Sequence, residues 1–215
     1  MKRIILIRHG QTTAPPRAMI SRSDYPLSQT GLNQAYLLAE RLQDPEYGPP
    51  ESKPVYFYGP DLNPATLQGQ EKTVFKPDLA LTSPLQRARQ TAQIVLKSCN
   101  ITPRVVDDFR EIELGLFEGL TSLEAQSRYP RAWAERGLDL FNSAPPEGES
   151  YAQLAQRVLP AYNSILDQNN KATEIVIIAH RAVIQVILAA ETALPLDQAP
   201  KIQIQRGEMK ILIKK

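Results

Sequence analysis

Short apolar runs alternate with longer stretches of helical periodicity along most of this chain. Two runs, residues 4–7 and 174–179, are rich in β-branched side chains, as expected of strands buried on both faces. Two further short strands are predicted at residues 78–81 and 105–106. Near the end of the sequence, residues 202–213, interrupted at Arg206-Gly207-Glu208, predict a closing hairpin.

Helices are predicted between these runs, because apolar residues recur there at spacings of three and four. In the first helix, residues 31–43, the apolar stripe consists of Leu32, Ala35, Tyr36, Ala39 and Leu42. The second helix follows Ser83-Pro84, where serine is expected to cap the helix and proline to take its first position.

The later helices carry clear start signals. Residues 121–124 (TSLE) and 150–153 (SYAQ) both match the capping box, in which side chains satisfy free backbone N–H groups at a helix start. The second of these helices is predicted to reach about residue 167, with a bend at Pro160. Residues 182–190 are nearly all apolar and predict a buried helix.

Strands alternating with helices are typical of an α/β fold, and we expect a three-layer α/β/α sandwich with a mostly parallel central sheet. A length of 215 residues fits one domain, 1–215. Residues 44–77 do not fit the pattern, because they hold seven prolines and predict no helix or strand. We expect a Pro-rich insertion on the side away from the strand carboxyl ends. Packed decoration, a partner-docking segment and a flap over the site remain open alternatives.

Composition narrows the class of protein without naming a function. With 42% hydrophobic and 22% charged residues, the chain is expected to bury an ordinary globular core. A net charge of +2, spread evenly, predicts neither a nucleic-acid nor a membrane partner. The apolar run at residues 4–7 is too short for a signal peptide, and no stretch approaches the roughly 20 apolar residues of a membrane span. Cys99 is the only cysteine, which excludes a disulfide scaffold and favours a cytoplasmic location.

The candidate chemistry lies where predicted strands end. His9 and His180, the only two histidines, each follow a strand directly. In open α/β sheets, ligands bind beyond the carboxyl ends of the strands. One histidine in such a place could be structural, but two together point to a site. We therefore predict that both face one ligand.

Two arginines and a glutamate converge on the same edge. Arg8 precedes His9, and Arg87 lies in the first turn of the helix after Ser83-Pro84. A guanidinium can hold two phosphate oxygens at once, so this pair favours a phosphate ligand. Glu111 lies in a segment whose glycines suggest close backbone approaches. A metal site made of His9, His180 and Glu111 is a poorer fit, because a metal needs no arginines beside it.

Five segments in order resemble the histidine phosphatase superfamily, also called the phosphoglycerate mutase-like family. RHGQT, at residues 8–12, resembles the family's RHG-x-T signature, and SPLQRARQTA its second-arginine motif. REIELGLFEG is similar to the segment that carries the proton-donor glutamate, and PPEGESYAQLAQRV and IVIIAH match later landmarks. The resemblance runs from Lys2 to about Ala190.

The resemblance implies a mechanism that also makes physical sense. His9 would attack phosphorus and form a phosphohistidine, while Arg8, Arg87 and His180 hold the phosphoryl group. Glu111 would protonate the leaving oxygen and later take a proton from water, for which a raised pKa is required. No cofactor and no metal are expected. The family usually has glycine after the second histidine, whereas Arg181 stands here and leaves the local geometry open.

Hydrolysis is the favoured reaction. The mutase branch follows its RHG motif with a Ser-x-Trp-Asn stretch and has Asn-Lys after the glutamate segment, where this chain has Thr12-Thr13-Ala14-Pro15 and Thr121-Ser122. We therefore expect a phosphomonoesterase of the histidine acid phosphatase type that acts on a small phosphorylated metabolite. A phosphoglycerate mutase-type phosphotransferase and a non-catalytic phospho-ligand binder are the alternatives. A homodimer is compatible with the sequence.

The residues that would select the substrate are less sharply indicated. The loop after the first strand supplies one group of candidates and residues 114–148 supply another. The candidates for contacts around the phosphate and substrate are Gly10, Gln11, Arg22, Tyr25, Arg128, Trp133 and Arg136. Several have an ordinary structural reading, with Trp133 in the core and Arg22 paired with Asp24.

Overall fold

The computed structural model describes residues 2–43, the backbone of 55–58, and residues 75–214. Its centre is a sheet of strand order β2-β6-β1-β5-β3-β4. In chain order the strands are β1 (Lys2–Arg8), β2 (Val55–Tyr58), β3 (Leu79–Thr82), β4 (Arg104–Val105), β5 (Glu174–Ala179) and β6 (Met209–Lys214). β1, β5, β3 and β4 run parallel, and β6 is antiparallel to both of its neighbours. The expected mostly parallel α/β sheet is confirmed.

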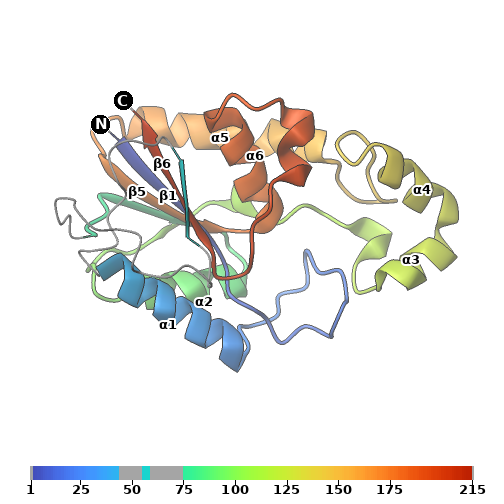
Figure 1. The fold of residues 1–215 in the computed structure, drawn as a ribbon, viewed down its shortest axis with the longest axis horizontal. Helices are drawn as coiled ribbons and strands as arrows, with labels where there is room; N and C mark the ends of the chain where they lie inside the picture. Colours follow the sequence, from blue (N-terminus) through green and yellow to red (C-terminus); the bar gives the residue numbers. More distant parts are fainter. Residues whose placement is uncertain (1, 44–54, 59–74, 215) are drawn as a thin grey trace.

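Helices cover both faces of the sheet (Figure 1). The α-helices are α1 (Gln29–Gln43), α2 (Gln86–Val95), α3 (Ser122–Arg128), α4 (Pro130–Leu138), α5 (Tyr151–Gln168) and α6 (Arg181–Glu191). Short 3₁₀ turns lie at η3 (Asp107–Phe109), η4 (Gly115–Phe117) and η5 (Leu196–Lys201). α1 and α2 pack on one face and α5 and α6 on the other, which gives the three expected layers.

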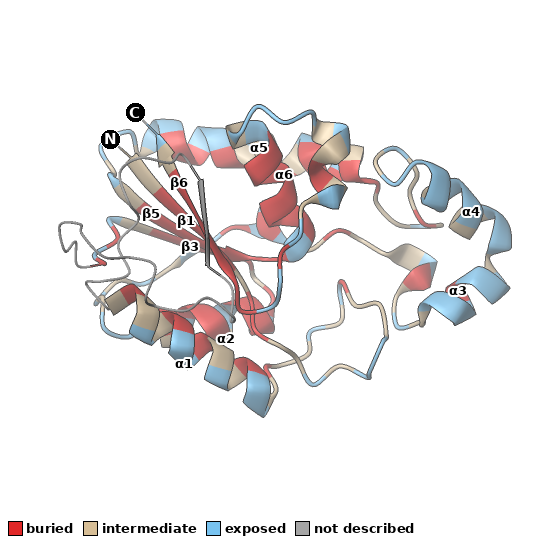
Figure 2. Ribbon diagram, in the orientation of Figure 1, coloured by how far each residue is buried: buried red, intermediate tan, exposed pale blue. Residues whose placement is uncertain are grey.

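Alternation along the strands explains why both faces are covered. In β1, Ile4 and Leu6 pack into the core under α5 and α6, whereas Ile5 and Ile7 pack toward α1 and α2. All four are at most 1% exposed. Successive strand side chains point to opposite faces, so a run of four apolar residues needs two hydrophobic layers. β1, β3, β5 and β6 are largely buried, while α3 and α4 project outward and are largely exposed (Figure 2).

Most sequence predictions of elements are confirmed, with shifts of one or two residues. Both capping boxes form, with Thr121 and Ser150 as N-cap residues. α5 passes through Pro160 without ending. In α1, however, Tyr36 is 54% exposed and Leu38 is buried in its place, so the predicted apolar stripe was wrong at one position.

Three local predictions are wrong. α2 begins at Gln86, with Leu85 rather than Ser83 at the N-cap, and the Ser83 hydroxyl both accepts the backbone N–H of Leu85 at 3.3 Å and contacts His180. The predicted hairpin at 202–213 contributes only β6. Carbonyls in its first half are taken by side chains, since Arg8 donates to the oxygen of Ile204 and Gln185 to that of Ile202. No second strand forms there to pair with β6.

The third error concerns the Pro-rich insertion, where no strand was expected. β2 lies within it and pairs with β6, from Val55 opposite Leu212 to Tyr58 opposite Met209. Its register depends on a partner about 150 residues away, which local sequence does not reveal. The rest of the insertion, 44–54 and 59–74, lies outside the described residues. The choice between packed decoration, a partner-docking segment and a flap over the site therefore stays open.

Candidate active site

The two histidines lie side by side where β1 and β5 end. The strands pair so that Arg8 is opposite Ala179, and the backbone N–H of His9 donates to the carbonyl of Ala179 at 3.1 Å. The rings of His9 and His180 are 5.1 Å apart between centroids and inclined at 64°. Their exposed fractions are only 6% and 0%. The structure thus brings the two histidines together at one edge of the sheet, as predicted.

His9 is held in one tautomer. Its Nδ1 lies 2.7 Å from the carbonyl oxygen of Gly10. A carbonyl only accepts hydrogen bonds, so Nδ1 must carry the proton and Nε2 must keep its lone pair. Burial, followed by the charges of Arg87 and Arg8, lowers the pKa of His9 well below its ordinary value. The ring is therefore neutral at pH 7, and a neutral imidazole is a competent nucleophile toward phosphorus.

His180 is positioned by Ser83, which follows β3. Nε2 of His180 lies 2.7 Å from the Ser83 hydroxyl oxygen. Burial, then the proximity of His9 and of Arg87, lowers the pKa of His180 well below its ordinary value. Its Nδ1 is buried without a hydrogen-bond partner within the described part of the chain. Leaving such an atom unpaired is unfavourable, so it marks a place for a ligand.

Arg8 and Arg87 bring two positive charges to the histidines. Burial lowers the pKa of Arg8 to about 10, so its guanidinium stays charged at pH 7. One Arg8 nitrogen donates to Ile204, and Nε is buried without a partner among the described residues. Arg87 is 2% exposed and donates to the carbonyls of Ser21 and Ser23, at 2.7 and 3.0 Å. It therefore anchors the loop after β1 as well as placing its charge beside His9.

Glu111 approaches from the segment that links η3 to η4. One carboxylate oxygen, Oε1, accepts the backbone N–H groups of Ile112 and Ala182, at 3.1 and 3.2 Å. Since Ala182 is two residues beyond His180, this contact ties Glu111 to the start of α6. The side chain lines the same cavity as Arg8.

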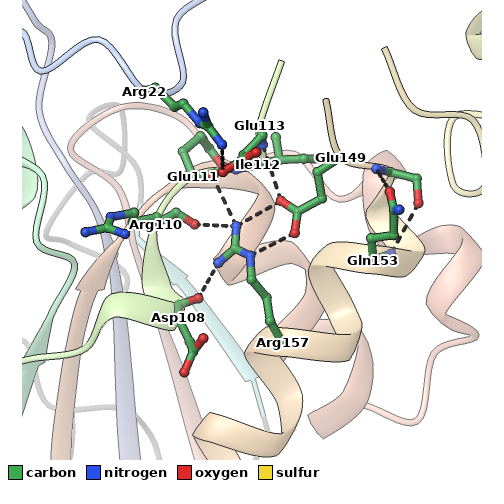
Figure 3. A network of polar contacts seen from close by, with 10 residues as sticks. Arg22, Asp108, Arg110, Glu111, Ile112, Glu113, Glu149, Gln153 and Arg157 are labelled. Atoms are coloured by element: carbon green, nitrogen blue, oxygen red, sulfur yellow. Dashed lines mark hydrogen bonds and ion pairs between the residues drawn. The ribbon is translucent and has the colours of Figure 1, made fainter. Parts of the chain in front are cut away.

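A polar network, visible in Figure 3, holds the backbone of Glu111 from behind. Arg157 of α5 donates to the carbonyl oxygens of Asp108, Arg110 and Glu111, the last two at 3.0 and 3.2 Å. The same guanidinium pairs with both oxygens of Glu149, which also accepts from the N–H of Glu113. Neither Arg157 nor Glu149 was predicted from the sequence. The one hint in the sequence is that both residues lie within PPEGESYAQLAQRV, a segment that resembles a motif of the family.

Gly10 is required by packing. A Cβ on Gly10 would lie 2.5 Å from the carbonyl oxygen of Gly31 in α1, and a Cβ on Gly31 would collide with the backbone of Gln11. The two glycines thus let α1 pack directly on the loop that carries His9. The suggested close approach of Gly10 to a phosphate stays a prediction.

A cavity of about 480 Å³ is lined by Arg8, which precedes His9, and by Arg181 and Ala182, which follow His180, but not by the two histidines themselves. Arg8 and Glu111 line it, and the loop after β1, η4, α4 and the start of α5 supply other parts of its wall. Of the predicted selectivity residues, Trp133 and Arg136 line it, as does Arg181. Trp133 is half-buried, with its ring 5.8 Å from that of Phe117, rather than a core residue.

Other predicted contact residues lie away from this cavity. Arg22 is 68% exposed and pairs with Glu113, not with Asp24 (Figure 3). The backbone N–H of Gln11 donates to the side chain of Gln34 in α1. Gln11, Tyr25 and Arg128 are not among the residues that line the cavity. In contrast, Arg206 and Tyr151 line it and were not predicted.

Other kinds of site are not found in the described residues. Outside 44–54 and 59–74, no three His, Cys, Asp or Glu side chains are grouped so that they could hold a metal ion. The described helices include none with the length and apolar character of a membrane span.

Comparison with known proteins identifies the family. Residues 4–48 and 65–213 match the histidine phosphatase superfamily (branch 1). A phosphoglycerate mutase of Schizosaccharomyces pombe is 27% identical over 209 residues, which cover 95% of this chain and 86% of that protein. A metal-independent phosphoserine phosphatase of Arabidopsis thaliana is 28% identical over 192 residues, which cover 86% of this chain and 66% of that protein.

Solved structures show the same fold. The α-ribazole phosphatase of Shigella flexneri superposes with a TM-score of 0.78 at 21% identity, covering 97% of this chain and 89% of the other. A mycobacterial glucosyl-3-phosphoglycerate phosphatase gives 0.76 at 24% identity, with 98% and 89% covered. The α/β fold of this chain thus has counterparts among solved structures. The chain belongs to the histidine phosphatase superfamily.

Proposed function

We propose that this protein is a metal-independent phosphomonoesterase that hydrolyses a small phosphorylated metabolite through a phosphohistidine on His9. The observation that carries the proposal is the Nδ1–H···O=C bond from His9 to Gly10, 2.7 Å long. It leaves the Nε2 lone pair available for attack in a ring that burial keeps neutral.

The surrounding groups fit the two steps of the reaction. In the first step Nε2 of His9 forms a bond to phosphorus while the bond to the leaving oxygen breaks, and Glu111 gives that oxygen a proton. Arg8 and Arg87 offset the negative charge of the transferred group, and the neutral ring of His180 donates a hydrogen bond to it. In the second step Glu111 takes a proton from water, the water oxygen attacks phosphorus, and His9 is released with inorganic phosphate.

The unpaired atoms of the site support an anion in this place. Nδ1 of His180 and Nε of Arg8 are both buried without a partner within the described residues. Both belong to side chains that the mechanism assigns to the phosphoryl group, and a phosphate offers several strong acceptor oxygens. A bound phosphoryl group would thus satisfy two atoms that the protein itself leaves unsatisfied.

The test is hydrolysis of p-nitrophenyl phosphate by the purified protein in the presence of a chelator. We expect turnover that the chelator does not reduce, and an acid-labile phosphoryl label on the protein when the reaction is quenched during turnover. His9→Ala should abolish both. A label on a serine, or undiminished turnover by His9→Ala, would overturn the mechanism.

A mutase is the second candidate, because the S. pombe relative is a phosphoglycerate mutase. Its reaction requires that the phosphohistidine be protected from water until the acceptor binds. With 3-phosphoglycerate and a bisphosphate primer, we expect release of inorganic phosphate to exceed isomerisation. Efficient isomerisation with little phosphate release would assign the chain to that reaction instead. Binding of phosphorylated ligands with no turnover across a substrate panel would instead favour a non-catalytic binder.

A further inference from the structure

Three arginines line the cavity without a task in the chemistry described above. Arg136 comes from α4, Arg181 opens α6 directly after His180, and Arg206 lies between η5 and β6. They are distant in the sequence, and the fold brings them to the walls of one space beside Arg8. Arg181 stands where glycine is usual in the superfamily, so this cluster is not explained by the shared catalytic motif.

The positive charge that lines the cavity exceeds the negative charge that lines it. Among the residues that the structure describes, none of the three arginines forms an ion pair with a carboxylate. Glu111 is the one acidic side chain among those that line the cavity, where four arginines are present. An excess of like charge in a partly enclosed space attracts an anion.

The arginines are also close enough to influence one another. Burial, and beyond it the charge of Arg181, lowers the pKa of Arg136, and the charges of Arg181 and Arg206 act in the same direction on Arg8. Arg136 is anchored through a 2.7 Å hydrogen bond to the carbonyl of Ser143. Arg181 lies beside the buried hydroxyl of Tyr151. These contacts hold Arg136 and Arg181 where they line the cavity. Each guanidinium carries five N–H groups, so N–H groups remain that can donate to a ligand.

The cavity is larger than a phosphoryl group needs. Its volume of about 480 Å³ lies within the range of small-molecule sites, roughly 300–1,000 Å³. Part of its wall is apolar, formed by Met19, Ile20, Trp133 and Leu140. The space therefore suits a metabolite-sized leaving group that meets both apolar and cationic surface.

We propose that Arg136 and Arg181, assisted by Arg206, form a second anion subsite, so that the substrate is a phosphomonoester whose leaving group is itself anionic. The second group is a carboxylate or another phosphate, which present similar acceptor oxygens to a guanidinium. This inference rests on the proposed hydrolase activity and names the class of its substrate.

Matched substrate pairs provide the test. 3-Phosphoglycerate and glycerol 3-phosphate differ by a carboxylate in place of a hydroxymethyl group, and fructose 1,6-bisphosphate carries one phosphate more than fructose 6-phosphate. We expect kcat/KM to be higher for the more anionic member of at least one pair by about tenfold, the effect of one charge-assisted hydrogen bond. The difference should lie mainly in KM. The pair that shows it identifies the second group as carboxylate or phosphate.

Variants connect the preference to the arginines. Arg181→Gln and Arg136→Gln should each reduce the ratio of kcat/KM within that pair by about tenfold. Arg131→Gln is the matched control, because Arg131 lies on the same helix as Arg136, is 92% exposed and pairs with Glu135. It should leave the ratio unchanged. Equal kcat/KM within both pairs, or an unchanged ratio in Arg181→Gln and Arg136→Gln, would overturn the subsite.

Binding separates this proposal from the activity on which it rests. Calorimetry with His9→Ala and the same four compounds measures the preference without turnover. If the protein hydrolyses neither these compounds nor p-nitrophenyl phosphate, but His9→Ala still binds the more anionic member about tenfold more tightly, the hydrolase fails and the subsite stands. If p-nitrophenyl phosphate is hydrolysed and neither assay shows a preference, the subsite fails and the hydrolase stands.

Discussion

Arg157 and Glu149 form a two-pronged ion pair, with Nε–Oε1 and Nη2–Oε2 separations of 2.8 and 2.9 Å. The guanidinium also donates to three carbonyl oxygens within residues 108–111, the last of them that of Glu111 (Figure 3). An arginine in the middle of α5 thereby fixes the direction from which the carboxyl group of Glu111 enters the cavity. The pair is half-buried, and its geometry depends on the planar fork that only arginine provides.

Arg157→Lys should therefore reduce the rate of hydrolysis most for substrates whose leaving group must be protonated by Glu111. Lysine keeps the charge but cannot pair with Glu149 and three carbonyls together. We expect kcat for an alkyl phosphate to fall by about 10- to 100-fold, the scale expected when a catalytic group is displaced by about 1 Å. Hydrolysis of p-nitrophenyl phosphate should fall much less, because its leaving group departs without a proton.

The control for Arg157→Lys is Arg110→Gln. Arg110 lies in the same segment, its side chain is exposed, and within the described residues its ion pair is with Asp107. This substitution should change neither rate. An equal loss for both substrates in Arg157→Lys would indicate general damage to the fold and contradict a role in positioning Glu111.

Glu111→Gln tests the carboxyl group itself. Glutamine keeps the acceptor oxygen for the N–H groups of Ile112 and Ala182 but cannot give or take a proton. We expect turnover of alkyl phosphates to fall by about 10²- to 10⁴-fold, the usual range for general acid–base catalysis. Quenched-flow labelling with p-nitrophenyl phosphate should still detect the phosphohistidine, and it should persist longer than in the unmodified protein. A normal alkyl phosphatase rate would remove Glu111 from the mechanism.

Gly31→Ala should destabilise the protein. The added Cβ would collide with the backbone of Gln11, and backbone cannot yield as a flexible side chain does. We expect the free energy of unfolding to fall by about 1–3 kcal/mol, as for other overpacked sites. Gly137→Ala in α4 is the matched control, because a Cβ there meets nothing within 4 Å. It should be neutral or stabilise by up to about 1 kcal/mol in urea unfolding, since alanine favours helix.

The buried histidines predict how stability depends on pH. Both pKa values lie well below 6.5 in the folded protein and return to that value on unfolding. Below pH 6.5 the unfolded state binds protons that the folded state does not, so the free energy of unfolding falls as the pH falls. Each histidine contributes a slope of up to about 1.4 kcal/mol per pH unit. Above pH 6.5 both histidines are neutral in the folded and the unfolded state, so the full stability is present there and the histidines add no slope.

Urea unfolding from pH 7.5 to pH 5 measures this slope. Carboxylates with lowered pKa, such as that of Glu118, add a slope of the same sign at lower pH. His9→Gln and His180→Gln remove the histidine part and should each flatten the curve between pH 6.5 and pH 5. A curve that stays the same in both variants would show that the histidines are not buried as neutral groups.

The parts of the fold that the sequence predicts are those with a local cause. β1 and β5 are continuous β-branched runs, and the capping boxes need only residues three apart, so no distant partner decides them. The meeting of His9 and His180 was also predictable, because parallel strands present their carboxyl ends at one edge. These features depend on rules that act within a few residues.

The features that were missed depend on contacts between distant segments. β2 forms because β6 offers it a partner, and residues 202–205 stay irregular because Arg8 and Gln185 take their carbonyls. Arg157 has the sequence character of a solvent-facing charge on an amphipathic helix. Its function as an anchor appears only when the backbone of residues 108–111, about 46 to 49 positions earlier, lies beside it.

β2 has a further consequence for how molecules of this protein can meet one another. It falls within residues 49–64, which the superfamily match leaves out, and it gives β6 a neighbour on its outer side. The described sheet therefore ends in a strand of four residues at one side and a strand of two at the other. Short terminal strands offer few free N–H and C=O groups to a second chain and so discourage aggregation through a shared sheet. Pairing of two copies through either described edge of the sheet is therefore disfavoured.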